Sequence, residues 1–419
     1  MLTWPPPYIP QLPGRGLAVQ VRDSSTDQLV LAAAGTDATL YVCGITPYDA
    51  THLGHAATYV AFDVLGRAWR DAGLRVRYAS NVTDVDDPLL ERAASLGIDW
   101  RDLAAEQTQL YAEDMTALAV IPPDVYCGVV EVIPAVVEAV EVLLAAGAAY
   151  RVPTPESLAD DDLGDVYADL TADIDFGAVA GLDDDTMRTL SAERGGDPER
   201  AGKRAPLDPL LWRRERAGEP AWDGGSLGRG RPGWHIECAV IARDALGLPF
   251  DVEGGGSDLQ FPHHEMSTSH ARLLDQGRGA RVHLHTGMVG LDGHKMSKSR
   301  GNLVLVSSLR EQGVDPMAVR LAILAHRYRD DWDWTDEGLH AAQARLEHWR
   351  AAVSGNGGPD ADSTLAAVRA ALADDLDTPA ALAAIDAWSD LSLAGTADPV
   401  EGAPGVIGRT LDALLGIRL

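Results

Sequence analysis

One apolar stretch and the turn after it constrain the fold more than any other feature of this sequence. Residues 39–43 (TLYVC) are typical of a short buried strand, and residues 44–54 (GITPYDATHLG) form a turn rich in breakers. Apolar residues then recur at helical spacing over residues 55–73, where Gly73 is a candidate C-cap. Residues 74–87 supply the next strand. A strand–helix–strand unit with a glycine in its first turn predicts an α/β fold with a doubly wound, Rossmann-like parallel sheet.

The length of 419 residues exceeds what one compact core usually holds, so several domains are expected. After about residue 88 the pattern changes to long helical segments and a polar region, and the strand–loop–helix rhythm returns near residue 232. This predicts an insertion between two halves of one nucleotide-binding fold. The expected parts are an N-terminal segment (1–38), the two halves of the catalytic fold (39–87 and 232–302), a connective insertion (88–231), stem-contact-like helices (303–350) and a C-terminal helical domain (351–419).

Composition excludes several classes of protein. The three cysteines, an odd and sparse count, argue against a disulfide framework and for a reducing compartment. The first residues lack the features of a secretory signal, and no stretch reaches the roughly 18 apolar residues that span a bilayer. The formal net charge of -28 disfavours nucleic acid as a partner. We therefore expect a cytoplasmic protein without a membrane partner.

Two short motifs carry residues suited to binding a nucleoside triphosphate. In THLGH, His52 and His55 lie at a helix start, where free N–H groups and the helix dipole attract phosphate. In KMSKS, Lys295 and Lys298 lie on a Gly-flanked loop and can neutralise a leaving pyrophosphate. Each motif alone also fits an ordinary helix start or a solvated basic turn. Together and in this order they resemble the signatures of class I aminoacyl-tRNA synthetases, which implies an enzyme that forms adenylates.

Cys43, Cys238 and His263 are candidate metal ligands. Their spacing matches no contiguous zinc-binding pattern, and alone it favours two buried cysteines and a surface histidine. However, the strings YVCGITPYD, NVTDVDD, PGWHIEC, GGGSDLQFPHHE and HKMSKS occur in the order found in cysteinyl-tRNA synthetases. That resemblance implies one Zn²⁺ per chain, held by these three residues.

The position of the family's fourth zinc ligand, a glutamate, is occupied here by Ser267. Three protein ligands would leave one tetrahedral position open, which is usual for a reactive zinc. The thiolate of a substrate cysteine would fill it, since zinc stabilises a thiolate far below its free pKa. Serine's hydroxyl is a poorer ligand, so the metal itself would reject serine.

Other departures from the synthetases resemble the cysteine ligases of the mycothiol pathway. They include Ile45, Pro47 and the string ERGGDP at residues 193–198. The resemblance implies ATP-dependent ligation of L-cysteine to the amine of glucosaminyl-inositol (1-O-(2-amino-2-deoxy-α-D-glucopyranosyl)-1D-myo-inositol). The reaction would pass through cysteinyl-AMP and release pyrophosphate and AMP. Residues 351–419 hold ten acidic and three basic residues, a composition ill suited to grip tRNA, so no tRNA partner is expected.

The resemblance also implies the remaining site residues, a Mg²⁺ ion bound with ATP, and a monomer. The adenylate would be lined by Gly44, Ile45, Thr46, Thr58, Asn81, Val82, Thr83 and Trp234, the ribose held by Gly256, Ser257 and Asp258, and the adenine met by Val289. The Arg- and Gly-rich segment 193–233 is the expected acceptor side. Two alternatives stay open: a true cysteinyl-tRNA synthetase, and a non-catalytic paralogue that binds zinc and an adenylate.

Overall fold

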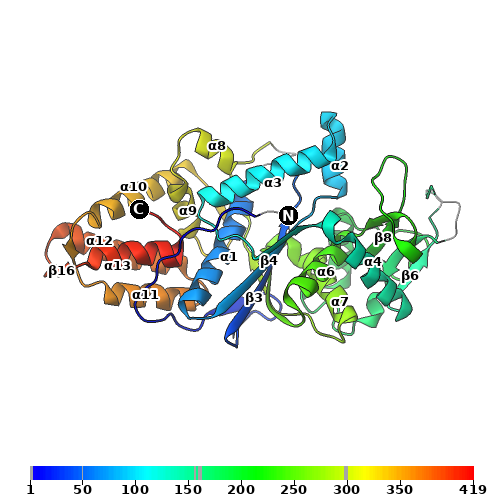
Figure 1. The fold of residues 1–419 in the computed structure, drawn as a ribbon, viewed down its shortest axis with the longest axis horizontal. Helices are drawn as coiled ribbons and strands as arrows, with labels where there is room; N and C mark the ends of the chain where they lie inside the picture. The colour runs from blue at the N-terminus through cyan, green and yellow to red at the C-terminus, as the bar shows by residue number, and fades with distance from the viewer. Residues whose placement is uncertain (1–2, 50, 155–156, 159–162, 297–300) are drawn as a thin grey trace.

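Five parallel strands form a sheet at the centre of the molecule (Figure 1). The computed structural model describes residues 3–49, 51–154, 157–158, 163–296 and 301–419. The sheet order is β11–β10–β3–β4–β5, and these strands span Ala280–Thr286, Phe250–Gly256, Asp37–Ile45, Arg75–Val82 and Val125–Gly128. Every neighbouring pair is parallel, which confirms the predicted α/β class.

The first strand–helix–strand unit lies where the sequence predicted it. Strand β3 is almost continuously buried, as expected for a parallel strand covered on both faces. Helix α1 (Leu53–Asp71) begins slightly before the predicted start, because the His52 ring caps it by accepting a hydrogen bond from the N–H of Gly54 at 3.1 Å. The chain leaves the helix at Gly73, whose φ of +88° favours glycine.

The two halves of the sheet meet between β3 and β10, which are neighbours although far apart in sequence. Helix α1 follows β3, and helix α7 (Glu265–Leu274) follows β10. In open parallel sheets of this kind, ligands bind outside the carboxyl ends of the strands at the point where the strand order reverses. The carboxyl ends of β3, β4 and β10 therefore mark the candidate site.

The region expected as an insertion contributes to the central sheet as well. After α2 (Asp87–Leu96) and α3 (Trp100–Ala117), strand β5 pairs with β4 at the sheet edge. Beyond it, helix α4 (Val129–Ala145), helix α5 (Asp184–Glu193) and a four-stranded antiparallel sheet cover one end of the molecule (Figure 1). The strands of that sheet, β6 to β9, are Ala149–Val152, Asp165–Ala168, Leu210–Arg214 and Gly230–Pro232. The division of the chain at residues 88 and 231 stays a prediction.

Helices α8 to α13 extend from the opposite side of the central sheet to the last residues of the chain (Figure 1). They span Val306–Glu311, Pro316–Leu324, Asp336–Ala352, Asp362–Ala373, Thr378–Ala394 and Ala403–Thr410. The segment predicted as stem-contact-like helices also contains a strand, β14 (Trp332–Trp334), which pairs with β12 (Val289–Leu291). Strand β12 in turn pairs with β13 (His294–Lys295).

A buried ion-pair cluster joins the helical region to the catalytic sheet. Asp63 of α1 accepts hydrogen bonds from Arg67 Nε at 2.7 Å and from Arg320 of α9. Arg320 also donates to the carbonyl oxygens of Leu118 at 2.8 Å and Leu415 at 2.6 Å. All three charged side chains are fully buried, so each charge depends on the others for compensation.

A short hairpin pairs β1 (Gln20–Asp23) with β2 (Gln28–Leu31), and β15 (Gly357–Gly358) pairs antiparallel with β16 (Val400–Glu401), which lies beyond α11 and α12 in the chain. Among the helices in the described part of the chain, none is long and apolar enough to cross a membrane.

Candidate active site and metal centre

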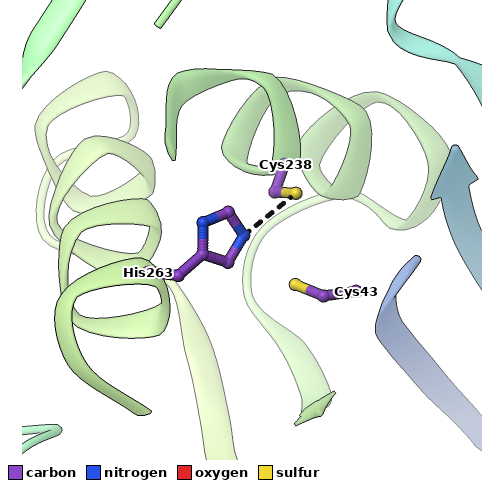
Figure 2. A group of neighbouring side chains, drawn as sticks. All are labelled: Cys43, Cys238 and His263. Carbon is purple, nitrogen blue, oxygen red and sulfur yellow. Dashed lines mark hydrogen bonds between the residues drawn. The ribbon is translucent and has the colours of Figure 1, made fainter. Parts of the chain in front are cut away.

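The three candidate metal ligands converge at the carboxyl end of β3. Figure 2 shows Cys43 from β3, Cys238 from α6 (Trp234–Leu246) and His263 from the kinked turn Gln260–His264, with their side chains directed toward one another. Their sulfur and nitrogen atoms all lie within 4.8 Å of one another, and all three residues are buried. Two sulfurs and an imidazole are a donor set that suits zinc.

The two cysteines of the group differ in how readily their thiols ionise. A hydrogen bond from Cys43 and the charge of His263 lower the pKa of Cys238 to about 5, although burial opposes its ionisation. Burial and the bond with Cys238 raise the pKa of Cys43 well above its usual value. His263 Nε2 lies 3.2 Å from Cys238 Sγ. A divalent cation bound among these atoms would displace the remaining thiol proton, because cysteine binds metals as the thiolate.

Asn81 holds the turn that follows Cys43. Its side-chain oxygen accepts hydrogen bonds from the N–H of Gly44 at 2.8 Å and from the Tyr41 hydroxyl at 3.0 Å, and it lies 3.7 Å from Cys238 Sγ. Its amide nitrogen donates to Thr83 Oγ1 at 3.1 Å. A Cβ on Gly44 would lie 1.6 Å from the backbone oxygen of Asn81, so only glycine fits at this irregularity in the parallel pairing of β3 with β4.

A cavity of about 480 Å³ lies beside the cysteine–histidine group. It brings together most of the predicted ligand residues: Cys43, Gly44, Ile45, Thr46, His52, His55, Thr58, Trp234, Gly256, Asp258 and Val289. Among the described residues, Asn81, Val82, Thr83 and Ser257 do not line it. Asn81 and Thr83 instead lie behind the wall, where their hydrogen bonds support the turn at Gly44.

The two signature histidines are stacked at the start of α1. The ring centroids of His52 and His55 are 3.9 Å apart, with an interplanar angle of 25°. Burial, aided by the neighbouring His52, lowers the pKa of His55 well below its usual value, so the His55 ring is neutral. Its Nδ1 has no hydrogen-bond partner among the described residues. In a neutral ring this unpaired nitrogen can donate a hydrogen bond to a bound nucleotide, or accept one from it, according to the tautomer.

The signature lysines are only partly described. The backbone of Lys295 lies in β13, where it pairs with Gly290 of β12, next to Val289. Lys298 falls outside the described residues. Contacts of both lysine side chains with ATP stay predictions.

A second, larger cavity of about 890 Å³ adjoins the first. Both are lined by Thr46, Tyr48, Trp234, Asp258 and Leu259, which form their common wall. The Trp234 ring also stacks on His263, with centroids 4.2 Å apart. The larger cavity reaches into the segment 193–233, and the sequence-based prediction missed its acidic members, such as Asp86, whose pKa burial raises to about 6.

Arg194, which belongs to the segment 193–233 expected on the acceptor side, lines the larger cavity. Its guanidinium donates hydrogen bonds to the carbonyl oxygens of Asp258, at 2.6 Å, and Phe261. These bonds connect the insertion to the turn that carries His263, so the side chain has a structural role there as well.

Sequence reasoning also missed the buried polar residues behind the metal group. His264 Nε2 lies 3.2 Å from Cys43 Sγ, and Glu253 of β10 accepts a hydrogen bond from Ser267 Oγ at 3.0 Å. Cys43, Glu253 and His264 form a second group whose ligand atoms lie within 4.8 Å of one another. The available signal was a second acidic residue, Glu253, two positions after Asp251 on the same face of the strand FDVEGGG.

Comparisons with known proteins identify the family of the chain. Residues 30–344 match the profile of the family described as tRNA synthetases class I (C) catalytic domain. The L-cysteine:1D-myo-inositol 2-amino-2-deoxy-alpha-D-glucopyranoside ligase of Sanguibacter keddieii is 72% identical, and the ligase of the same name from Cellulomonas flavigena 67% identical, each over 100% of both chains.

A solved structure supports the fold alone. The methionyl-tRNA synthetase of Mycobacterium tuberculosis, in complex with methionyl-adenylate, has a TM-score of 0.59 at 16% identity. The similarity covers 90% of this chain and 89% of that one. Together with the full-length relatives, it confirms the resemblance and the fold class predicted from the motifs. The chain belongs to the family of the L-cysteine:1D-myo-inositol 2-amino-2-deoxy-alpha-D-glucopyranoside ligases, built on the class I tRNA synthetase catalytic domain.

Proposed function

We propose that this enzyme joins L-cysteine to the amine of glucosaminyl-inositol at the expense of ATP, through a cysteinyl-AMP intermediate. The observation that carries the proposal is the junction of two cavities at Trp234, beside the Cys43, Cys238 and His263 group. The smaller cavity would hold the adenylate and the larger one the amino sugar. Relatives identical at 72% and 67% bear the name of this ligase, which supports the choice of substrates.

In the first step, the cysteine carboxylate attacks the α-phosphate of ATP and pyrophosphate leaves. Holding the two reactants in line supplies much of the acceleration. His52 and His55 at the start of α1, with Lys295 and Lys298 on the KMSKS loop, would stabilise the phosphate charge, and Mg²⁺ bound with ATP would supply further positive charge there. The neutral His55 ring would act by hydrogen bonding and not by charge. Asp258 and Gly256 would hold the ribose, and Val289 would meet adenine.

We propose that the cysteine–histidine group holds a zinc ion. Bound there, zinc would supply a Lewis acid that keeps the substrate's sulfur as a thiolate, a distinction that a hydrophobic pocket could not make against serine. Cys43 belongs to both the group and the smaller cavity, so a sulfur bound in that cavity would meet the ion. Trp234 would keep His263 in orientation by stacking on it.

In the second step, the sugar's ammonium group loses a proton to solvent and the neutral amine attacks the activated carbonyl. The C–N bond forms, the bond from that carbonyl carbon to the phosphate oxygen breaks so that AMP leaves, and the amide nitrogen gives up a second proton to solvent. The shared wall of the cavities lets the amine approach the carbonyl from the larger cavity while the nucleotide stays in the smaller one. Carboxylates among the mixed acidic and basic residues that line the larger cavity, such as Asp86, would suit a substrate that arrives as an ammonium ion.

The runner-up function is a cysteinyl-tRNA synthetase, and the composition of the C-terminal helices argues against it. Arg369 of α11 is engaged with Asp71 of α1 at 2.8 Å, and Arg418 lies 3.7 Å from Asp412. Two of the three basic residues in 351–419 are thus paired with carboxylates and do not form a phosphate-binding surface. A monomeric, cytoplasmic enzyme is the expected state, on the sequence grounds given above.

The deciding experiment supplies ATP and L-cysteine with either glucosaminyl-inositol or tRNA and measures AMP release and product mass. We expect AMP and an amide product with the amino sugar alone. Aminoacylated tRNA, or no AMP release with either acceptor, would refute the proposal. Cysteine-dependent ATP–pyrophosphate exchange separately tests the non-catalytic alternative, because a binding-only paralogue would show none.

The metal is tested with two matched cysteine variants. Cys238→Ser should lose bound zinc and cysteine-dependent exchange, because it removes the low-pKa thiolate from the group. Cys127→Ser should retain both, since Cys127 of β5 is outside the group. Equal zinc contents in the two variants would exclude the proposed site.

A further inference from the structure

Glu253 is a buried acidic residue that the proposed reaction does not use. It lies on β10 with 3% of its surface exposed. Burial alone would favour the neutral acid, because a carboxylate loses its hydration in the interior. A buried carboxylate therefore requires either donors or a cation, and both can be checked in the surroundings of Glu253.

The hydrogen-bond partners of Glu253 act as donors. Ser267 Oγ donates to Oε1 at 3.0 Å and Thr268 Oγ1 donates to Oε2 at 2.8 Å. Both residues belong to α7, directly after the turn that carries His263 and His264. Donors to both oxygens favour the ionised form, so the structure holds a buried negative charge at this point.

The compensating positive charge is incomplete. Within the described residues, no Lys or Arg side chain forms an ion pair with this carboxylate, and the basic group in range is His283, with Nε2 at 3.3 Å. On another side, a carboxylate oxygen of Glu253, Cys43 Sγ and a ring nitrogen of His264 all lie within 4.8 Å of one another. Cys43 is also a member of the proposed zinc group, so the carboxylate lies next to the place for a divalent cation.

We propose that Glu253 is a positioning residue of the metal centre, whose carboxylate retains the ion from behind Cys43 and His264. This inference rests on the proposed zinc site. By supplying negative charge from outside the cysteine–histidine group, Glu253 strengthens the hold on the ion without occupying the coordination position left for the substrate's sulfur. Ser267 keeps the carboxylate oriented through its hydrogen bond.

The test compares zinc affinities, measured by competition with a chromophoric chelator, in purified full-length variants. Glu253→Gln keeps the shape and removes the charge, and we expect zinc affinity to fall by about 10- to 100-fold, as for other residues that support metal ligands. The visible spectrum of the cobalt-loaded variant should also change, which a purely structural role would not cause. Asp251→Asn is the matched control: it lies on the same strand, accepts hydrogen bonds from Thr39 at 2.7 and 2.9 Å, and should leave zinc affinity unchanged.

A second variant guards against misfolding. Glu253→Asp keeps the negative charge on a side chain one methylene shorter, so its zinc affinity should stay closer to that of the unmodified protein than the affinity of Glu253→Gln does. Unchanged affinity in Glu253→Gln would overturn the inference, as would a folded Glu253→Asp variant that binds zinc no better than Glu253→Gln. Zinc binding by the unmodified protein and its loss in Cys238→Ser report on the zinc site itself, and the ratio between the unmodified protein and Glu253→Gln reports on Glu253.

Discussion

The close approach of Gly44 in β3 to Asn81 in the neighbouring strand β4 gives the sharpest prediction from the structure. A Cβ at this position would lie 1.6 Å from the backbone oxygen of Asn81 and 2.5 Å from its carbonyl carbon. The strand ends would have to separate by roughly 2 Å to restore ordinary van der Waals contact. The neighbouring obstacle is backbone in the central sheet, so it cannot rotate away as a side chain would.

The consequence for catalysis follows from the position of Cys43. Gly44 is bonded through its N–H to Asn81 at 2.8 Å, and any shift of this turn carries Cys43 away from Cys238 and His263. A displacement of about 1 Å at a reacting centre can cost on the order of 10²-fold in rate. We therefore expect Gly44→Ala to lower cysteine-dependent ATP–pyrophosphate exchange by about 100-fold or more, and to destabilise the fold by ~1–3 kcal/mol through overpacking.

Exchange and urea denaturation are measured on Gly44→Ala and on a matched control, Gly35→Ala. A Cβ on Gly35 would meet its nearest neighbour, the backbone of Asp37, at 3.7 Å, which is an ordinary contact. The control should behave as the unmodified protein. If Gly44→Ala retains exchange within a factor of about three, the backbone at Gly44 and Asn81 can move apart without displacing Cys43, and the predicted loss of catalysis is wrong.

Further predictions concern stability. Arg320→Met leaves Asp63 buried with one guanidinium fewer, so the free energy of unfolding should fall by ~3–5 kcal/mol in urea titrations, whereas Arg75→Met at an exposed pair should cause no resolvable change. A small effect of Arg320→Met on the free energy of unfolding would mean that the charge of Asp63 does not depend on Arg320 for compensation. Burial raises the pKa of Asp86 from 3.8 to about 6, so the folded protein binds this proton more tightly than the unfolded chain does. The resulting stabilisation is present below about pH 4 and lost as the pH rises through about 6. Asp86→Asn should therefore match the unmodified protein near pH 4 and be more stable at pH 7, by at most about 3 kcal/mol. Parallel pH dependence of the two proteins would contradict the assignment.

Local patterns in the sequence were sufficient to predict much of the fold. The strand–turn–helix around Cys43, the parallel sheet and the family all followed from the order and spacing of short motifs. Apolar periodicity reports which face of an element is buried, and this suffices for elements that are neighbours in the chain. It could not reveal that β5, some distance beyond β4 in sequence, joins the sheet edge, because pairing partners are not encoded in a single strand's pattern.

The chemistry of the site depended on contacts between distant parts of the chain. His263 and His264 are adjacent in sequence and alike in type, yet the first meets Cys238 and the second meets Cys43. Only the path of the backbone through the kinked turn Gln260–His264, in which Phe261 is extended, assigns those partners. Likewise, the carboxylate of Glu253 reaches the metal group because β10 lies beside β3. The sequence by itself determined which residue types were present and which local elements carry them, whereas tertiary structure decided which atoms meet, because strand register and helix packing place residues that lie far apart in sequence within bonding distance.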